Sequence, residues 1–211
     1  MTQNDLLVED LGQLLATNGF FAASYDELFG ALKECSETDF ELMSFAWCEI
    51  QRRGKSGKID VAHTICEQRD LYPIPWLMDA RNVLSFLDGP TPRNYTQSVY
   101  VILRSGYTTG NGYGAYVGVT SRTPEERFKQ HTTPGHRLAA NGLPENGICL
   151  LKSLMHPFIK VPGRLKLQYE TAMHLALSLA VPRVTGDIRD DYLQWLPDLQ
   201  PRLMKALNET S

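Results

Sequence analysis

The stretch from Ser98 to His131, SVYVILRSGYTTGNGYGAYVGVTSRTPEERFKQH, predicts a strand, a glycine-rich turn, a second strand and a helix. The two expected strands, at residues 99–103 and 115–119, consist mainly of β-branched and other apolar residues. Each strand contains one tyrosine. We therefore expect the rest of this part of the chain to be organised around a strand-turn-strand-helix unit.

The expected helix has clear start signals. Thr123 suits the N-cap, Pro124 the first helical position, and Glu126 stands where it closes a capping box. Arg127 and His131 are four residues apart, so a helix places them on one face. Their side chains are expected to converge with the two strand tyrosines.

Composition predicts an ordinary soluble globular protein. The chain has 211 residues, of which 43% are hydrophobic and 21% charged. It contains no apolar run of the roughly 20 residues that a membrane span needs, and its first residues are acidic rather than basic and apolar. We expect a cytoplasmic protein that does not enter membranes. The four cysteines form no CxxC pair, which argues against a disulfide scaffold or a zinc knuckle.

The net charge of −3 conceals an uneven distribution. Residues 1–95 hold 8 basic and 15 acidic side chains, residues 96–186 hold 10 and 4, and residues 187–211 hold 3 and 5. The central segment is therefore basic. Such a segment suits a polyanionic partner, because phosphate neutralisation supplies most of the sequence-independent affinity for nucleic acid. A solvated basic face is the structural alternative.

Residues 1–90 are expected to form an all-α domain. Leucines between Leu6 and Leu15 share one helical stripe, and helix starts are expected at Ser24 with Glu27 and at Thr38 with Glu41. Two further helices are expected at 59–68 and 76–87. The polar stretch at 52–58 reads as an exposed loop, and its glycine spacing does not match a phosphate-binding P-loop.

A cluster of glycine and proline at 88–94 predicts a domain boundary, with a linker at 91–96 and a second domain at 97–211. A third strand is expected at 148–154, a long helix at 164–180, and terminal helices at 190–208. The expected class is α+β: a small three-stranded antiparallel sheet flanked by helices, preceded by the all-α domain.

The second domain resembles the GIY-YIG nuclease family over about residues 96–182. Ser98-Val99-Tyr100 corresponds to the first signature and Tyr116-Val117-Gly118 to the second. Arg127 corresponds to the family arginine on the following helix, and His131 lies four residues later, where members carry histidine or tyrosine. Glu170 corresponds to the single metal-binding carboxylate.

This resemblance implies a metal-dependent DNA endonuclease that hydrolyses phosphodiester bonds. Tyr100 and Tyr116 would position and deprotonate the attacking water, with His131 beside them. Arg127 would clamp the scissile phosphate, and Glu170 would hold one Mg²⁺ or Mn²⁺ ion. A structural ion pair between Arg127 and Glu170 is the alternative for these two residues. The expected substrate-binding residues are Gly118, Lys129, His136, Arg137, Lys160 and Arg164.

Two positions depart from the family pattern. Val119 stands where some members have a lysine that helps to activate the tyrosine. The stretch at 181–186 lacks the asparagine that many members carry after the glutamate, and Thr185 or Arg183 is the candidate to replace it.

The expected partner is double-stranded or branched DNA. A homodimer or sequential nicking is expected for cleavage of both strands, because each chain has one site. The acidic N-terminal domain is expected to bind a protein, to mediate dimerisation or to shape specificity. The alternatives are a catalytically inactive nucleic-acid-binding module and a nuclease toxin or effector.

Overall fold

The computed structural model describes residues 22–35, 39–85, 96–108, 112–140, 142–158 and 163–188, without the side chains of Phe158, Arg164 and Leu165. The chain divides into two compact units, Met1–Met78 and Asp79–Ser211, here called the N-terminal unit and the C-terminal unit. The expected helices at 6–15 and 190–208, and all but the last residue of the expected linker at 91–96, lie outside the described residues. No helix of the described ranges is long and apolar enough to span a membrane.

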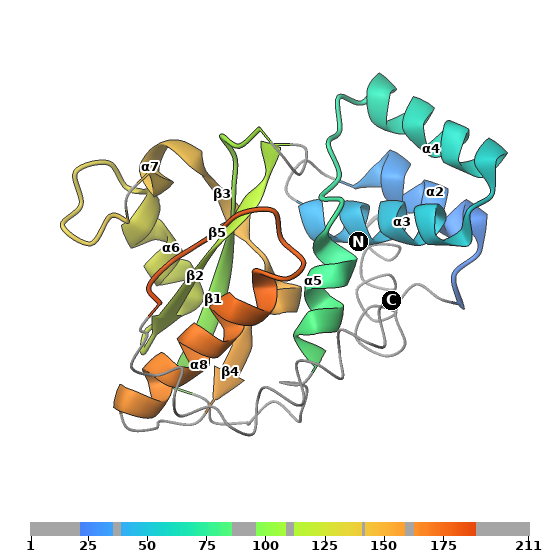
Figure 1. The fold of residues 1–211 in the computed structure, drawn as a ribbon. Helices are drawn as coiled ribbons and strands as arrows, with labels where there is room; N and C mark the ends of the chain where they lie inside the picture. The colour runs from blue at the N-terminus through green and yellow to red at the C-terminus, as the bar shows by residue number, and fades with distance from the viewer. Residues whose placement is uncertain are drawn as a thin grey trace. The chain divides into compact units, whose positions relative to one another are not determined.

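The N-terminal unit is built from helices, as Figure 1 shows. These are α2 (Tyr25–Glu34), α3 (Phe40–Arg53) and α4 (Ser56–Gln68), and α5 (Leu77–Val83) begins at the boundary. Ser24 and Glu27 form the predicted capping box at α2. At α3 the N-cap is Asp39 rather than the predicted Thr38, and its side chain makes no cap hydrogen bond.

The stretch predicted as a polar loop at 52–58 is largely helical. Arg52 and Arg53 belong to the last turn of α3, which ends at Gly54 with φ 66°. Three residues, Ser56 to Lys58, already belong to the first turn of α4. A left-handed residue ends the helix here, and glycine adopts that conformation without strain.

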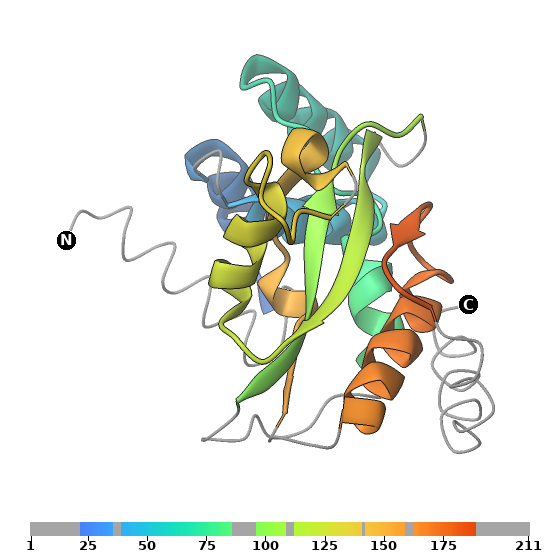
Figure 2. The same ribbon diagram turned by 90° about the vertical axis from the view of Figure 1, so that its left-hand side faces the viewer.

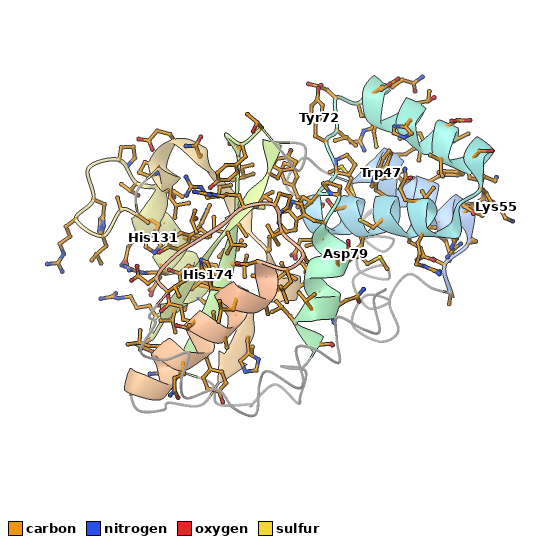
Figure 3. All side chains as sticks on the ribbon, in the orientation of Figure 1. Trp47, Lys55, Tyr72, Asp79, His131 and His174 are labelled. Carbon is orange, nitrogen blue, oxygen red and sulfur yellow. The ribbon has the colours of Figure 1, made fainter. Side chains whose placement is uncertain are left out.

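Two polar anchors stabilise this helical unit. The carboxylate of Glu49 is fully buried, and Nε of Arg52 and Nε of Arg53 each lie 2.7 Å from one of its oxygens. The Arg69 guanidinium donates to the backbone oxygens of Leu32 and Cys35 at 2.6 and 2.7 Å. These bonds satisfy carbonyl groups at the end of α2 that the helix itself leaves unpaired. The side chains of Trp47 and Lys55, labelled in Figure 3, belong to the same unit.

The C-terminal unit contains a five-stranded mixed sheet in its described residues. The strands are β1 (Gln97–Arg104), β2 (Gly114–Thr120), β3 (Gly147–Leu150), β4 (His156–Phe158) and β5 (Val184–Thr185). β1 pairs antiparallel with β2, β3 and β4, and β2 pairs parallel with β5. The α+β class is therefore observed, and the predicted three-stranded, purely antiparallel sheet is wrong.

The difference arises in two places. The strand predicted at 148–154 is interrupted by a 3₁₀ helix, η4 (Lys152–Leu154), which separates β3 from β4. The chain after the long helix returns to the sheet and adds β5 beside β2. Strands of two to four residues have too few alternating positions to be recognised in sequence.

Three helices accompany this sheet: α6 (Pro124–Thr132), the short α7 (Leu143–Asn146) and α8 (Gly163–Leu177). α6 contacts β1 and β3, whereas α8 contacts β1, β2 and β5. Figure 2 shows α6 and α8 on different sides of the β1–β2 hairpin. The hairpin and α6 thus have the strand-turn-strand-helix order predicted from the sequence.

Candidate active site

Tyr100 lies in the middle of β1, and its side chain is only 1% exposed. In the β1–β2 register it stands opposite Gly118. A Cβ atom at Gly118 would lie 2.6 Å from Cζ of Tyr100 and would also collide with its hydroxyl. Gly118, predicted to bind substrate, is itself buried, so packing against Tyr100 is enough to account for this glycine.

His131 is the hydrogen-bond partner of Tyr100. Nε2 of His131 lies 2.6 Å from the Tyr100 hydroxyl, and its side chain is 2% exposed. Burial lowers the pKa of His131 to about 4, the charge of Arg127 acts in the same direction, and a backbone hydrogen bond with Leu138 opposes them. The imidazole is therefore neutral at pH 7.

The pKa of Tyr100 is raised, first by burial and then by the neighbouring Tyr116. Tyr100 is therefore protonated at neutral pH, and the tautomer of His131 decides whether the Tyr100 hydroxyl or Nε2–H of His131 donates in this hydrogen bond. Tyr100 and His131 form a neutral, buried donor-acceptor pair behind the surface of the site.

Tyr116 lies on β2 and is half-buried. Its ring centroid is 5.3 Å from that of His131 and 6.4 Å from that of Tyr100. Burial raises the pKa of Tyr116, the negative charges of Glu170 and Asp187 raise it further, and Arg127 opposes them. Both carboxylates and the guanidinium therefore lie near the Tyr116 hydroxyl.

Arg127 is placed by the start of α6. The hydroxyl of Thr123 accepts the backbone N–H of Glu126, and Pro124 begins the helix as predicted. Arg127 is half-buried, and its Nη1 donates to Oε1 of Gln130 at 3.2 Å. Its positive charge lowers the pKa of both tyrosines and of His131, so the guanidinium lies near all three rings.

A pocket of about 640 Å³ opens beside this cluster. Three of the predicted catalytic residues line it: Tyr116, Arg127 and His131. Tyr100 does not line it, since the residue is buried behind the hairpin surface. The structure therefore brings the predicted aromatic and basic residues together, with Tyr116 rather than Tyr100 facing the pocket.

The opposite wall of the pocket comes from β5 and its flanks. Arg183, Thr185, Gly186 and Asp187 all line it. Gly186 has φ 133°, and a Cβ atom there would collide with the carbonyl oxygen of Val117. Glycine at this position lets β5 approach β2 closely.

Glu170 lies on α8 and is 7% exposed. Its negative charge raises the pKa of both Tyr100 and Tyr116, which places the carboxylate near the two rings. Among the described residues no group of three or more His, Cys, Asp or Glu side chains could hold a metal ion. A single carboxylate fits only a hard cation that takes its remaining ligands from water and from phosphate, as Mg²⁺ does. Glu170 is such a single carboxylate, and it is not among the residues that line the pocket.

The remaining predicted substrate-binding residues do not line the pocket or are not described. Lys129 and Arg137 are exposed, and Nδ1 of His136 accepts the backbone N–H of Leu138 at 3.1 Å. None of the three lines the pocket. Lys160 and the side chain of Arg164 are not described.

Sequence reasoning missed two charged residues of the pocket, Arg104 and Asp187. Arg104 ends an apolar strand and Asp187 follows a strand of two residues, so no local pattern marked either one. His174, labelled with His131 in Figure 3, belongs to α8 and is buried, and burial lowers its pKa.

Comparison of the chain with protein-family models, with curated proteins and with solved structures finds no match. The resemblance to GIY-YIG nucleases therefore rests on the residues themselves and stays a prediction.

Proposed function

We propose that this protein is a metal-dependent phosphodiesterase that cleaves DNA, with its site in the C-terminal unit. The observation that carries the proposal is the convergence of Tyr116, His131 and Arg127 on one pocket, with Tyr100 hydrogen-bonded directly behind. Hydrolysis of a phosphodiester needs a positioned water, charge compensation on the phosphoryl oxygens and support for the leaving oxygen.

Each residue has a distinct part in this proposal. Arg127 binds the scissile phosphate through its planar guanidinium, because such a fork matches phosphate oxygens. Tyr116 faces the pocket and orients the attacking water. Tyr100 lies behind the pocket, where its hydrogen bond with neutral His131 fixes the aromatic surface beside Tyr116.

Glu170 is the residue that would hold Mg²⁺ or Mn²⁺. When bound, such an ion lowers the pKa of a coordinated water and compensates charge on the phosphate. This positive charge would also offset the effect of Glu170 and Asp187 on the pKa of Tyr116. Val119 supplies no cation next to Tyr116, and among the described residues the charge of Arg127 lowers the pKa of Tyr116.

A nucleic-acid-binding module without catalysis is the second candidate. It is favoured by the raised pKa of both tyrosines, since a protonated phenol is a poor base at neutral pH. Both candidates place DNA at the same pocket, and they differ only in whether a bond is broken.

Incubation of the purified protein with supercoiled plasmid and Mg²⁺ or Mn²⁺ separates the two. Wild type should nick or linearise the plasmid, and Glu170→Gln should abolish cleavage. Glu145→Gln is the matched control, because Glu145 is an exposed carboxylate on α7 outside the pocket.

Intact supercoiled, branched and single-stranded DNA with wild type would overturn the catalytic proposal. Salt-dependent DNA binding in that case would support the second candidate. Cleavage at discrete positions would indicate a site-specific enzyme, and a smear would indicate a degradative one.

A further inference from the structure

Arg104, the last residue of β1, is a charged pocket residue with no part in the chemistry proposed above. Its guanidinium is half-buried and lines the same pocket as Arg127. Nη1 donates to Oγ1 of Thr185 at 3.1 Å, and Cζ lies 5.4 Å from the centroid of the Tyr107 ring. The side chain is thus held in one orientation by β5 and by an aromatic face.

Two glycines make room for this arrangement. Gly114 stands opposite Arg104 in the β1–β2 register, and a Cβ atom there would lie 2.8 Å from Cδ2 of Tyr107. Gly142 has φ 72°, and a Cβ atom there would lie 2.8 Å from Nη2 of Arg104. Thr185 is itself fixed, because its hydroxyl donates to the Ala115 backbone oxygen at 3.2 Å.

The charge of Arg104 is uncompensated within the described part of the chain. No carboxylate there forms an ion pair with it, and its Nε atom is buried without a hydrogen-bond partner. The other ionised side chains lining the pocket are Arg127, Arg183 and the exposed Asp187. With His131 neutral, the pocket lining carries three guanidinium groups, of which that of Arg183 is exposed, and one carboxylate; Glu170, whose charge also reaches Tyr116, lies outside the lining.

A partly buried cation without a partner is unfavourable for folding, and an anion in the pocket would offset that penalty. The guanidinium is already oriented, so little side-chain entropy is lost when it binds an anion. The pocket therefore has the charge and rigidity of a site for more than one anionic group.

We propose that Arg104 is a second phosphate-binding residue, which holds the phosphate next to the scissile one on the same DNA strand. This inference rests on the proposed function, because Arg127 is taken to hold the scissile phosphate. Arg104 does not touch the reacting atoms, so its contribution is to substrate affinity and register.

The first test measures anion binding without cleavage. Inorganic pyrophosphate is titrated by calorimetry, without metal, into wild type, Arg104→Gln, Arg104→Lys and Arg122→Gln. Arg122 is the matched control, since it is an exposed arginine that does not line this pocket. Arg104→Gln should weaken binding at least about tenfold, the effect of losing a charged hydrogen bond. Arg104→Lys should keep part of the pyrophosphate affinity that Arg104→Gln loses. Arg122→Gln should bind pyrophosphate as tightly as wild type.

The second test follows cleavage of an oligonucleotide. Arg104→Gln should raise KM and leave kcat nearly unchanged, and a neutral methylphosphonate next to the scissile phosphate should raise the wild-type KM without affecting the variant further. The slope of log affinity against log salt should fall by about 0.7–0.9 in Arg104→Gln, as expected for the loss of one phosphate contact.

The outcomes separate this inference from the proposed function. Cleavage by wild type with equal KM and equal pyrophosphate affinity in Arg104→Gln would overturn the subsite and leave the nuclease proposal intact. Absence of cleavage, together with Arg104-dependent pyrophosphate binding, would support the anion site and overturn the nuclease proposal. If Arg104→Gln does not fold, the wild-type protein decides: a KM that is unaffected by the methylphosphonate next to the scissile phosphate would overturn the subsite.

Discussion

The contact between Gly118 and Tyr100 makes Gly118→Ala a sensitive probe of the site. The new Cβ atom would lie 2.6 Å from Cζ of Tyr100, whereas ordinary van der Waals contact begins at 3.4 Å. The Tyr100 ring cannot retreat freely, because the residue is 1% exposed and its hydroxyl is bound to His131. Overpacking of this kind destabilises a protein by about 1–3 kcal/mol.

Amide hydrogen exchange of β1 is the appropriate assay, since it reports on the C-terminal unit alone. Gly118→Ala should lower the free energy of opening of the β1 amides by about 1–3 kcal/mol. Gly163→Ala is the control in the same unit, because nothing lies within 4 Å of a Cβ atom at Gly163, and its effect should stay within about 0.5 kcal/mol.

A second substitution tests the cause. Tyr100→Phe removes the hydroxyl that the new methyl group meets, so Gly118→Ala should be less harmful in the Phe background, with a coupling energy of about 0.5–3 kcal/mol. Wild-type protection in Gly118→Ala would refute the reasoning, because it would show that Tyr100 does not pack against Gly118.

Three further predictions concern charge. The pKa of His131 is lowered from 6.5 to about 4, so between these pH values the unfolded chain binds a proton that the folded one does not. This group should therefore lower the free energy of unfolding as pH falls through that window, by up to about 1.4 kcal/mol per pH unit. Urea titrations at several pH values should show that His131→Gln lacks this contribution. An equal dependence of the free energy of unfolding on pH in both proteins would contradict a neutral buried imidazole. Glu49→Gln removes the buried charge that Arg52 and Arg53 bind, and should destabilise the N-terminal unit by about 1–3 kcal/mol in hydrogen exchange; an equal loss in the C-terminal unit would argue against a local effect. Arg127→Lys should lower the rate of DNA cleavage by about 10²–10³-fold without a change in unfolding, because lysine lacks the planar fork; a wild-type rate would count against Arg127 as the phosphate clamp.

The elements that the sequence predicts well are those with local causes. The capping box of Ser24 and Glu27, the start of α6 at Thr123 and Pro124, and the β1–β2 hairpin all appear where expected. The two helix starts depend on side chains only three residues apart or fewer, and the hairpin joins two strands that are consecutive in sequence. β4, β5 and η4 depend instead on pairing or packing with β1 and β2, so their own residues carry little signal.

In the candidate site, too, the residues placed by local sequence patterns were predicted, and those placed by contacts distant in sequence were not. Helical spacing was sufficient to place Arg127 and His131 on one face, and the strand tyrosines follow from the hairpin. The sequence did not predict that Tyr100 is buried and Tyr116 faces the pocket, because the burial of Tyr100 depends on contacts with residues distant in sequence, such as Leu143. Asp187 reaches the pocket, and Thr185 reaches Arg104, through the pairing of β2 with β5, a contact between segments about 70 residues apart.

The position of β5 near the end of the described chain has a consequence for biosynthesis. Ribosomes add about 5–20 residues per second, so the 60 residues from Arg127 to Asp187 take about 3–12 s to make. During that interval the hairpin and α6 have been synthesised, but the wall of the pocket formed by Arg183, Thr185 and Asp187 does not yet exist. The nascent protein therefore completes this pocket only several seconds after Arg127 has been added to the chain.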